Sequence, residues 1–352
     1  MRMLVAGGAG FIGSNFVRWL FERDGKAFGE HHIVVYDSLT YAGNLENLQG
    51  LEGRSDFRFI RGDIRDADAV AAAIHDEKID TVVNFAAESH VDRSILDPLS
   101  FVRTNLEGTQ VLLNCSQSAG VKRYLQVSTD EVYGSLGPTG RFTEDSPIAP
   151  SSAYSASKAG SDFLVLAAHH THHFPSMVSR CSNNYGPYQF PEKLIPLMVT
   201  NAMTDQPLPL YGDGKNVRSW LHVDDHSHAL MLILQNGRPG EVYNIGGAPE
   251  SERENVDVVH QILKLTEKPT TLIRPVEDRK GHDRRYAVDF TKMNRELGWS
   301  PKVDFENGLR QTVQWYRENE SWWRRVKSGE YQRFYESYYG ARLQEGGSRT
   351  AH

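Results

Sequence analysis

The feature that most constrains this chain is the glycine-rich turn after its first apolar segment. Residues 3–6 form a short apolar run, followed by Gly-Gly-Ala-Gly-Phe-Ile-Gly and then by the apolar periodicity of a helix. A strand, a glycine turn and a helix in this order are typical of a dinucleotide-binding unit. Gly7 permits the tight turn, Gly10 lets the backbone approach a pyrophosphate, and Gly13 allows close helix–sheet packing. The N-terminus of the helix would face the phosphates.

The second apolar segment, residues 33–37, ends in an acidic residue, Asp37. A carboxylate there can accept hydrogen bonds from both hydroxyls of an adenosine ribose, and it repels a 2′-phosphate. The residues that follow, Ser38, Leu39 and Thr40, include no arginine that could bind such a phosphate. The sequence therefore predicts NAD rather than NADP, against the alternative that Asp37 lies in an ordinary turn.

Apolar segments alternate with helical periodicity as far as residue 180, which predicts a doubly wound, parallel α/β sheet of the Rossmann type. Prolines and glycines interrupt any long period further on, so we expect a smaller, mixed α/β substrate-binding lobe. The predicted domains are residues 1–182, which bind NAD, and residues 183–352. Segments near 219–246 are expected to return to the sheet of the first domain.

A second motif pairs Tyr154 with Lys158, four residues apart and on one face if the segment is helical. Ser152 and its neighbours are plausible helix-start residues. A positive charge beside a phenol favours phenolate, so Tyr154 would serve as a general base that deprotonates an alcohol.

The segment just before it, Ser-Thr-Asp-Glu from Ser128 to Glu131, follows another predicted strand. Thr129 supplies a hydroxyl that could orient an alcohol, while Asp130 and Glu131 could move two further protons. Two adjacent carboxyls can act as acid and base only if their environments separate their pKa values.

Composition excludes several other classes of protein. The chain has 39 basic and 45 acidic side chains, a net charge of −6, which gives no reason to expect nucleic acid or an anionic membrane as a partner. No apolar run approaches the ~18–20 residues of a membrane span. The chain has two cysteines, Cys115 and Cys181, and it opens in a strand without a leader, so we expect a cytoplasmic protein.

A cluster of histidines at positions 169, 170, 172 and 173 resembles a metal site at first sight. No cysteine or acidic ligand accompanies these histidines, and cationic side chains are favoured at a helix C-terminus. We therefore predict a surface helix end and no metal.

Together these motifs resemble those of the extended short-chain dehydrogenase/reductases, and within them those of the dTDP-glucose 4,6-dehydratases. The similarity runs from Met3 to about Tyr339, and it is most specific in Thr-Asp-Glu-Val-Tyr-Gly at 129–134 and in the segment 183–196. The resemblance implies catalytic roles for Thr129, Asp130, Glu131, Tyr154 and Lys158. It also implies a homodimer that forms through the helices carrying Asn105 and Tyr154.

The expected NAD site comprises Gly7, Gly10, Phe11, Ile12, Gly13, Asp37, Ser38, Leu39, Thr40, Asp63, Ile64, Phe85, Ala86, Ala87, Ser89, Thr104, Val127, Tyr154, Lys158 and Asn184. The expected dTDP-sugar site comprises Ser89, Thr129, Asn183, Glu192, Lys193, Leu194, Pro209, Leu210, Tyr211, Arg218, Asn255, Asp278, Arg279 and His282. Arg218 suits a diphosphate because a guanidinium pairs with phosphate oxygens bidentately. Lys280 departs from the family, which usually has proline there, and this puts the contacts of its loop in doubt.

By this resemblance the reaction converts dTDP-glucose to dTDP-4-keto-6-deoxyglucose and water, and NAD is returned unchanged. Tyr154 removes the C4 hydroxyl proton, Glu131 removes the C5 proton, and protonated Asp130 gives its proton to the leaving C6 hydroxyl. Three alternatives stay open: a sugar-nucleotide 4-epimerase, a UDP-glucuronate decarboxylase and a non-catalytic NAD-binding regulatory module. An epimerase needs no C5 base or C6 acid, so the Asp130–Glu131 pair counts against it.

Overall fold

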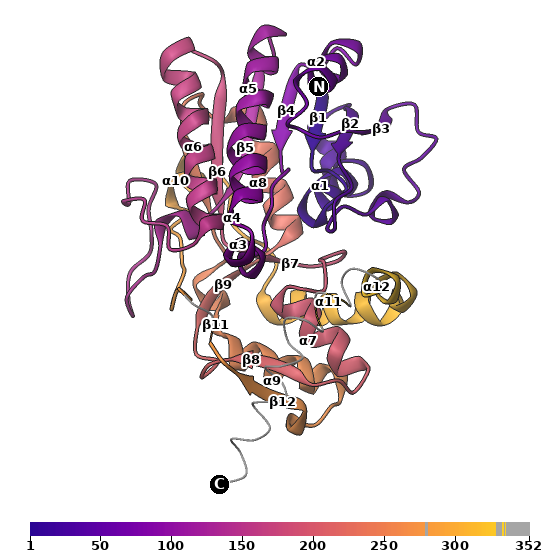
Figure 1. Cartoon of the computed structure of the whole chain (residues 1–352), viewed down its shortest axis with the longest axis vertical. Helices are drawn as coiled ribbons and strands as arrows, with labels where there is room; N and C mark the ends of the chain where they lie inside the picture. The colour runs from indigo at the N-terminus through magenta and orange to yellow at the C-terminus, as the bar shows by residue number, and fades with distance from the viewer. Residues whose placement is uncertain (279–280, 329–332, 334, 336–352) are drawn as a thin grey trace.

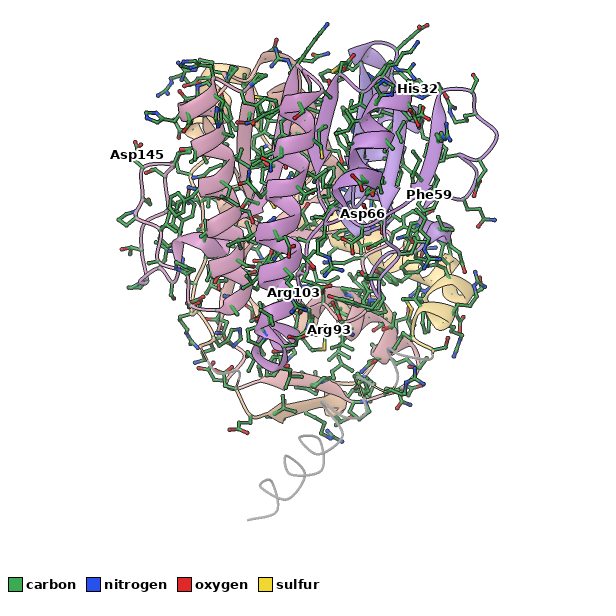
Figure 2. All side chains as sticks on the ribbon, turned by 45° about the horizontal axis from the view of Figure 1, so that its top comes forward. His32, Phe59, Asp66, Arg93, Arg103 and Asp145 are labelled. Carbon is green, nitrogen blue, oxygen red and sulfur yellow. The ribbon has the colours of Figure 1, made fainter. Side chains whose placement is uncertain are left out.

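The computed structural model describes residues 1–278, 281–328, 333 and 335. A large domain built on a seven-stranded sheet lies above a smaller lobe, and the carboxyl ends of the central strands point toward that lobe (Figure 1). Figure 2 shows His32, at the start of a strand, at the end of the large domain away from the lobe, and Arg93 and Arg103 at the end next to the lobe.

The large sheet is parallel throughout, as the sequence predicted. The chain adds strands on one side of β1 (Arg2–Ala6) and then crosses to add β4 (Thr81–Asn84) and later strands on the other side. β1 and β4 therefore flank the switch point at which such sheets bind ligands. In spatial order its strands are β10 (Val242–Ile245), β6 (Ser176–Cys181), β5 (Arg123–Thr129), β4 (Thr81–Asn84), β1 (Arg2–Ala6), β2 (His32–Asp37) and β3 (Phe57–Arg61).

Helices cover both faces of this sheet, and each face has its own apolar core. One core is formed with α1 (Phe11–Glu22), α8 (Val223–Asn236) and α10 (Thr291–Leu297). The other is formed with α2 (Ala67–Asp76), α5 (Gly108–Ser118) and α6 (Ala153–His172). The strands are buried on both sides, so they read as continuous apolar runs in the sequence rather than as alternating ones.

Between β4 and α5 the chain forms α3 (Val91–Leu96), α4 (Pro98–Phe101) and the π-helical turn η3 (Val102–Glu107). Asn105 in this turn is 1% exposed. Its amide accepts a hydrogen bond from the backbone N–H of Glu88 at 2.9 Å and donates to the Ser157 hydroxyl at 2.8 Å. Asn105 thereby ties the loop after β4 to α6, and both of these border the site described below.

The smaller lobe contains two short sheets and has a third core. One sheet has the order β11 (Glu252–Glu254), β9 (Val217–His222), β7 (Asn183–Tyr185), and the other pairs β12 (Ile273–Val276) with β8 (Leu208–Tyr211). The helices of this lobe are α7 (Leu194–Met203), α9 (Asn255–Thr266), α11 (Phe305–Glu318) and α12 (Glu320–Val326).

The segments predicted to return to the large domain do so only in part. Residues 243–245 belong to β10, which takes the sheet edge beside β6 as expected. The prediction for residues 220–222 is wrong, because β9 pairs with β7 and β11 in the smaller lobe. The next residue begins α8, which packs on α1, so the chain crosses between the two parts at residue 223.

Candidate active site

The glycine turn lies between β1 and α1, against the loop that follows β4. Gly7 has a φ of 75°, and a Cβ on it would lie 2.5 Å from the backbone nitrogen of Ala86. A Cβ on Gly13 would lie 2.4 Å from the Gly7 carbonyl oxygen. No side chain fits at either position, so the turn presents bare backbone beside the N-terminus of α1. A helix end of this kind favours the binding of phosphate.

Asp37 is the last residue of β2, and the backbone fixes the direction of its carboxylate. One oxygen accepts the backbone N–H of Ala9 at 2.9 Å, and the other accepts that of Leu39 at 2.8 Å. Burial raises the pKa of Asp37, and these two hydrogen bonds oppose the rise. Leu39 reaches this position with a φ of 54°, a conformation unusual for a branched side chain.

A cavity of about 430 Å³ runs along the carboxyl ends of the strands and brings together all but one of the residues predicted for the cofactor. The exception is Leu39, whose side chain packs against the core while its backbone holds Asp37. The lining includes Gly7, Gly10, Phe11, Ile12, Gly13, Asp37, Ser38, Thr40, Asp63, Ile64, Phe85, Ala86, Ala87, Ser89, Thr104, Val127, Tyr154, Lys158 and Asn184. A bare phosphate cradle and an oriented carboxylate in one cavity fit a dinucleotide.

His226 on α8 is a residue of this site that the sequence did not reveal. It is fully buried, and its Nδ1 lies 2.9 Å from the side-chain oxygen of Asn184, whose amide group also donates to the Ser182 carbonyl at 3.0 Å. Burial lowers the pKa of His226 to about 3, so the ring stays neutral and donates. It fixes Asn184 from a different helix, and no local motif indicates such a contact.

Tyr154 and Lys158 lie on α6, whose start is fixed by a capping box between Ser152 and Ser155. The prediction that residues around Ser152 begin the helix is confirmed. Tyr154 is 8% exposed and Lys158 is 3% exposed. The Lys158 ammonium donates to the carbonyl oxygen of Val127 at 2.7 Å, which ties the helix to β5.

The environment of the Tyr154 phenol differs from the sequence prediction. Burial raises the pKa of Tyr154 well above its ordinary value, the negative charge of Glu131 raises it further, and a hydrogen bond from Thr129 opposes the rise. The expectation of a phenolate near neutral pH considered the ammonium of Lys158 and left out the cost of burying a charge. In this structure that cost dominates.

Asp130 and Glu131 begin η4 (Asp130–Tyr133), the short 3₁₀ helix that continues β5. Asp130 is 1% exposed and lies in the first cavity, whereas Glu131 is half-buried and borders both cavities. Burial, and then the charge of Glu131, raise the pKa of Asp130 to about 8, while Arg218 and Thr129 act in the opposite direction. The chain thus places two neighbouring carboxyls in different environments at the end of β5. Asp130 is a buried, neutral acid, and Glu131 is the more accessible group.

A second cavity of about 160 Å³ opens between the sheet and the smaller lobe. It brings together most of the residues predicted for the sugar nucleotide, namely Asn183, Glu192, Lys193, Leu194, Pro209, Tyr211, Arg218, Asn255 and His282. The first cavity contains Ser89 and Thr129, and it also reaches Asn183, Glu192 and Lys193, so the two cavities meet at these residues. Burial raises the pKa of Glu192 to about 7.

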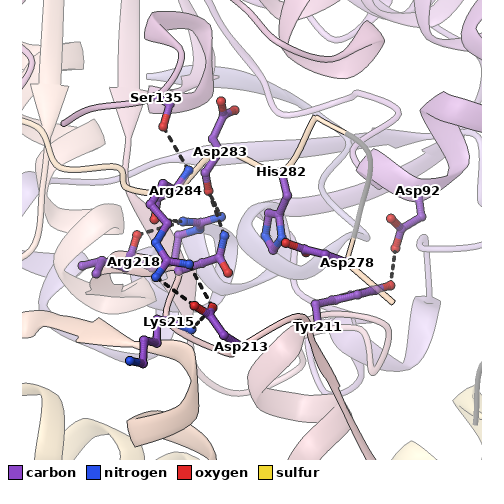
Figure 3. A network of polar contacts seen from close by, with 12 residues as sticks. Asp92, Ser135, Tyr211, Asp213, Lys215, Arg218, Asp278, His282, Asp283 and Arg284 are labelled. Atoms are coloured by element: carbon purple, nitrogen blue, oxygen red, sulfur yellow. Dashed lines mark hydrogen bonds and ion pairs between the residues drawn. The ribbon is translucent and has the colours of Figure 1, made fainter. Parts of the chain in front are cut away.

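Two predicted substrate residues that the structure describes, Leu210 and Asp278, line neither cavity. Leu210 lies between two lining residues on β8, so the pleat turns its side chain into the core of the lobe. Asp278 lies beside the cavity and accepts His282 Nδ1 at 2.6 Å (Figure 3). Arg279 lies outside the described residues, as does Lys280.

Arg218 is held at the wall of the second cavity. Its guanidinium donates to the Asp283 carbonyl at 3.0 Å (Figure 3). It also lies 4.4 Å from the centre of the Tyr286 ring. Asp283 and Tyr286 also line the cavity, although no motif in the sequence indicates them. Their place in a loop rich in charged residues gave no periodic signal.

The histidine cluster lies at the end of α6, and neither cysteine forms a disulfide. His172 is the last residue of α6, as expected, and His169 Nδ1 lies 2.9 Å from the Phe174 carbonyl oxygen. Within the described ranges no group of three or more histidine, cysteine or acidic side chains could hold a metal ion. Both cysteines are free, and no described helix is long and apolar enough to cross a bilayer.

The Rossmann sheet, the glycine turn and the Tyr154–Lys158 pair define an enzyme of the extended short-chain dehydrogenase/reductase class. The model of the GDP-mannose 4,6 dehydratase family matches residues 4–312, and the chain belongs to that family. A dTDP-glucose 4,6-dehydratase of Streptomyces niveus is 51% identical over 93% of this chain and 96% of the relative. One of Escherichia coli is 45% identical over 97% of this chain and 100% of its own length.

Solved structures agree with this assignment. A dTDP-glucose 4,6-dehydratase of Streptomyces venezuelae with NAD bound has a TM-score of 0.89 and 51% identity, covering 93% of this chain and 100% of that one. A UDP-glucose 4-epimerase of Thermus thermophilus with NAD has a TM-score of 0.82 and 29% identity, covering 91% and 100%. The fold is shared with epimerases, so the chemistry has to be read from the site.

Proposed function

We propose that this chain is an NAD-dependent hydro-lyase that converts dTDP-glucose to dTDP-4-keto-6-deoxyglucose and water. The observation that carries the proposal is the pair Asp130 and Glu131, in which burial keeps one carboxyl protonated at neutral pH. Relatives that are about half identical along nearly their whole length are dTDP-glucose 4,6-dehydratases, which supports the same substrate.

The first cavity is the proposed NAD site. The glycine turn and the N-terminus of α1 would hold the pyrophosphate, and Asp37 would bind the adenosine ribose. When bound, NAD supplies a nicotinamide ring that accepts hydride from C4 of the sugar and returns it to C6.

At the sugar, we assign Tyr154 as the base that takes the proton of the C4 hydroxyl, and Thr129 as the group that orients it. Thr129 already interacts with the Tyr154 phenol in the structure. Burial favours the protonated form of Tyr154, but only its phenolate can take the proton of the substrate. The positive charge of Lys158, one turn along the helix, is needed to stabilise that phenolate.

Elimination of water needs a base at C5 and an acid at C6. Once C4 is a ketone, the C5 proton becomes acidic, and Glu131 is the carboxylate placed to remove it at the meeting point of the two cavities. Asp130 gives its proton to the leaving hydroxyl. When hydride returns to C6, C5 takes up a proton again, which completes the 4-keto-6-deoxy product. The environments of these neighbours match the roles, because burial holds the proton on Asp130.

The second cavity is the proposed site of the dTDP group. Arg218 and Lys193 supply positive charge at its wall, which suits a diphosphate. Tyr211 on β8 lines the same wall, and its hydroxyl donates to Asp92 at 3.1 Å (Figure 3).

We further propose that the protein is a homodimer. Large apolar side chains are exposed on adjoining elements at one side of the sheet: Leu96 at 68%, Phe163 at 54%, Leu99 at 53%, Ile95 at 46% and Val102 at 45%. They come from α3, α4, η3 and α6, the helices around Asn105 and Tyr154. Exposed apolar patches of this kind mark interaction surfaces.

A cytoplasmic location is proposed on chemical grounds. Cys181 borders the NAD cavity as a free thiol, and Cys115 is also free, which suits a reducing compartment. The proposed ligands, NAD and the sugar nucleotide, are small polar molecules. The net charge of −6 offers no attraction to nucleic acid or to an anionic membrane.

The deciding experiment is incubation of the enzyme and NAD with dTDP-, UDP- and GDP-hexoses and with UDP-glucuronate, with the product mass and the absorbance of reduced nicotinamide recorded. We expect dTDP-glucose to lose the mass of one water with no net reduction of NAD. Recovery of an isomer of unchanged mass would instead indicate an epimerase, and loss of carbon dioxide from a UDP-uronate would indicate a decarboxylase. No turnover on any sugar nucleotide would favour a binding module.

A further inference from the structure

The mechanism leaves a buried ion pair behind the active site unused. Arg180 on β6 is 3% exposed and Asp162 on α6 is 0% exposed, and the guanidinium Nε donates to the Asp162 carboxylate at 2.8 Å. A second nitrogen of Arg180 donates to the Tyr133 hydroxyl at 2.9 Å, and the guanidinium carbon lies 4.9 Å from the centre of that ring.

Asp162 follows Lys158 by one helical turn, so the two side chains share a face of α6. Lys158 is itself 3% exposed, and its hydrogen bond at 2.7 Å goes to a neutral acceptor, the Val127 carbonyl. The carboxylate of Asp162 is therefore paired with one buried cation, Arg180, and lies one helical turn from another, Lys158.

We propose that the Arg180–Asp162 pair is a positioning device that keeps Lys158 in its ammonium form beside Tyr154. This rests on the role of Lys158 in the proposed function. The positive charge of Arg180 balances the charge of Asp162, so the guanidinium stabilises the buried carboxylate. That carboxylate is the negative charge near Lys158.

The electrostatics of Lys158 agree with this geometry. Burial lowers the pKa of Lys158, and Asp162 is the largest influence that raises it again, followed by Cys181. Burial raises the pKa of Asp162, while Arg180 and Lys158 oppose the rise. Removing the carboxylate would leave two buried cations without the charge between them.

The other elements packed against α6 carry few charges toward this position. Tyr154 lies on α6 itself, and Asp130, Glu131 and Tyr133 lie on η4. On α3, Arg93 contacts Glu192, and Asp92 accepts from Tyr211. Arg103 of η3 is exposed (Figure 2), and so is Glu107. On α5, the thiol of Cys115 donates to the Ala67 carbonyl oxygen. Asp162 is thus the carboxylate on the Lys158 face of the helix.

A purely structural role for the ion pair is the competing explanation, because buried ion pairs often contribute little to stability and yet are costly to break singly. The two explanations differ in what a charge-balanced double substitution does. Asp162→Asn leaves the pair with a formal charge of +1, Arg180→Gln leaves it with −1, and the double variant returns it to zero.

The test measures the protonation of Lys158 and the step it supports in these three variants. The first readout is the titration of the Lys158 side chain by NMR in substrate-free enzyme with ¹³Cε-labelled lysine, its signal identified by its loss in Lys158→Met. The second is the pH profile of single-turnover hydride transfer with dTDP-glucose, read at the reduced-nicotinamide absorbance. That step precedes any use of Asp130 as an acid.

For Asp162→Asn we expect the Lys158 titration to move to lower pH by at least about one pH unit, the effect of removing an opposite charge nearby. The alkaline limb of the hydride-transfer profile, at which Lys158 loses its proton, should move with it. Arg180→Gln should move them the other way, and the double variant should lie between Asp162→Asn and wild type, because Asp162 is the member of the pair that raises the pKa of Lys158. Asp225→Asn is the matched control, a buried carboxyl that accepts the backbone N–H groups of Lys302 and Val303, and it should leave the titration of Lys158 unchanged.

Profiles that stay in place in both single variants, with the double variant the least active, would overturn the proposal and leave a structural ion pair. If Asp162→Asn does not fold, the opposite shift in Arg180→Gln and the recovery in the double variant still decide the question. The NMR titration needs no turnover, so a wild-type enzyme inactive on dTDP-glucose would contradict the proposed function without deciding this inference.

Discussion

Replacement of Asp130 by asparagine should stabilise the protein while it disables the elimination of water. The carboxyl is 1% exposed, and among the described residues its Oδ2 has no hydrogen-bond partner. The pKa of Asp130 is raised from 3.8 to about 8, so about nine-tenths of the molecules carry the proton at pH 7. Asparagine keeps the shape of the side chain and has no proton to give to a leaving hydroxyl.

The effect on stability follows from proton linkage. Because the pKa is higher in the folded state, the folded state binds more protons than the unfolded state between about pH 4 and pH 8. Stability therefore falls as the pH rises through this window. At 1.36 kcal/mol for each pH unit, the cost is about 4 kcal/mol at pH 7. Asp130→Asn removes this cost, so its advantage over wild type should widen from pH 4 to pH 8.

The assay combines urea unfolding of substrate-free enzyme at pH 4.5, 6 and 8, values about evenly spread across this linkage window, with rapid-quench mass spectrometry. We expect the free energy of unfolding of the variant to exceed that of wild type increasingly with pH. Water loss should slow by about 10²–10⁴-fold, the usual contribution of a general acid, while hydride transfer from C4 continues. Asp225→Asn serves as the control that loses stability, because Asp225 accepts backbone hydrogen bonds. A stability difference that does not change with pH, or water loss at the wild-type rate, would refute the assignment of Asp130.

Three further expectations concern the cofactor, the base and the interface. Asp37→Ala should weaken NAD binding and reduce the preference over NADP, measured by fluorescence titration with both; a wild-type protein that prefers NADP would contradict this. Tyr154→Phe should abolish C4 oxidation and keep dTDP binding. Since burial raises the pKa of Tyr154, wild-type hydride transfer should accelerate from neutral to alkaline pH. A single-turnover rate that does not change with pH would exclude Tyr154 as the base. Leu96→Glu should convert a dimer to a monomer in analytical ultracentrifugation. Leu45→Glu is the control, at an apolar side chain away from this patch that is 44% exposed, and it should leave the dimer intact. The same sedimentation for wild type and both variants would place the interface elsewhere.

The parts of the fold and site that could be read from the sequence are those in which a short segment determines its own backbone. The glycine turn requires a tight loop that admits no Cβ at Gly7 or Gly13, and the structure has that loop. Strand and helix alternation predicted the parallel sheet, because strands buried on both faces leave uninterrupted apolar runs. The capping box at Ser152 and the helical spacing of Tyr154 and Lys158 are equally local.

Long-range contacts decided the rest. Burial is set by packing from several elements at once, and it reversed the expected pKa direction of Tyr154 while separating Asp130 from its neighbour. Residues 220–222 were expected to return to the large sheet, but they pair with β7 and β11 in the smaller lobe. His226 reaches Asn184 from another helix, and Arg180 meets Asp162 from a strand. Such contacts join residues far apart in the chain, so only the folded arrangement determines the charge states on which the chemistry depends.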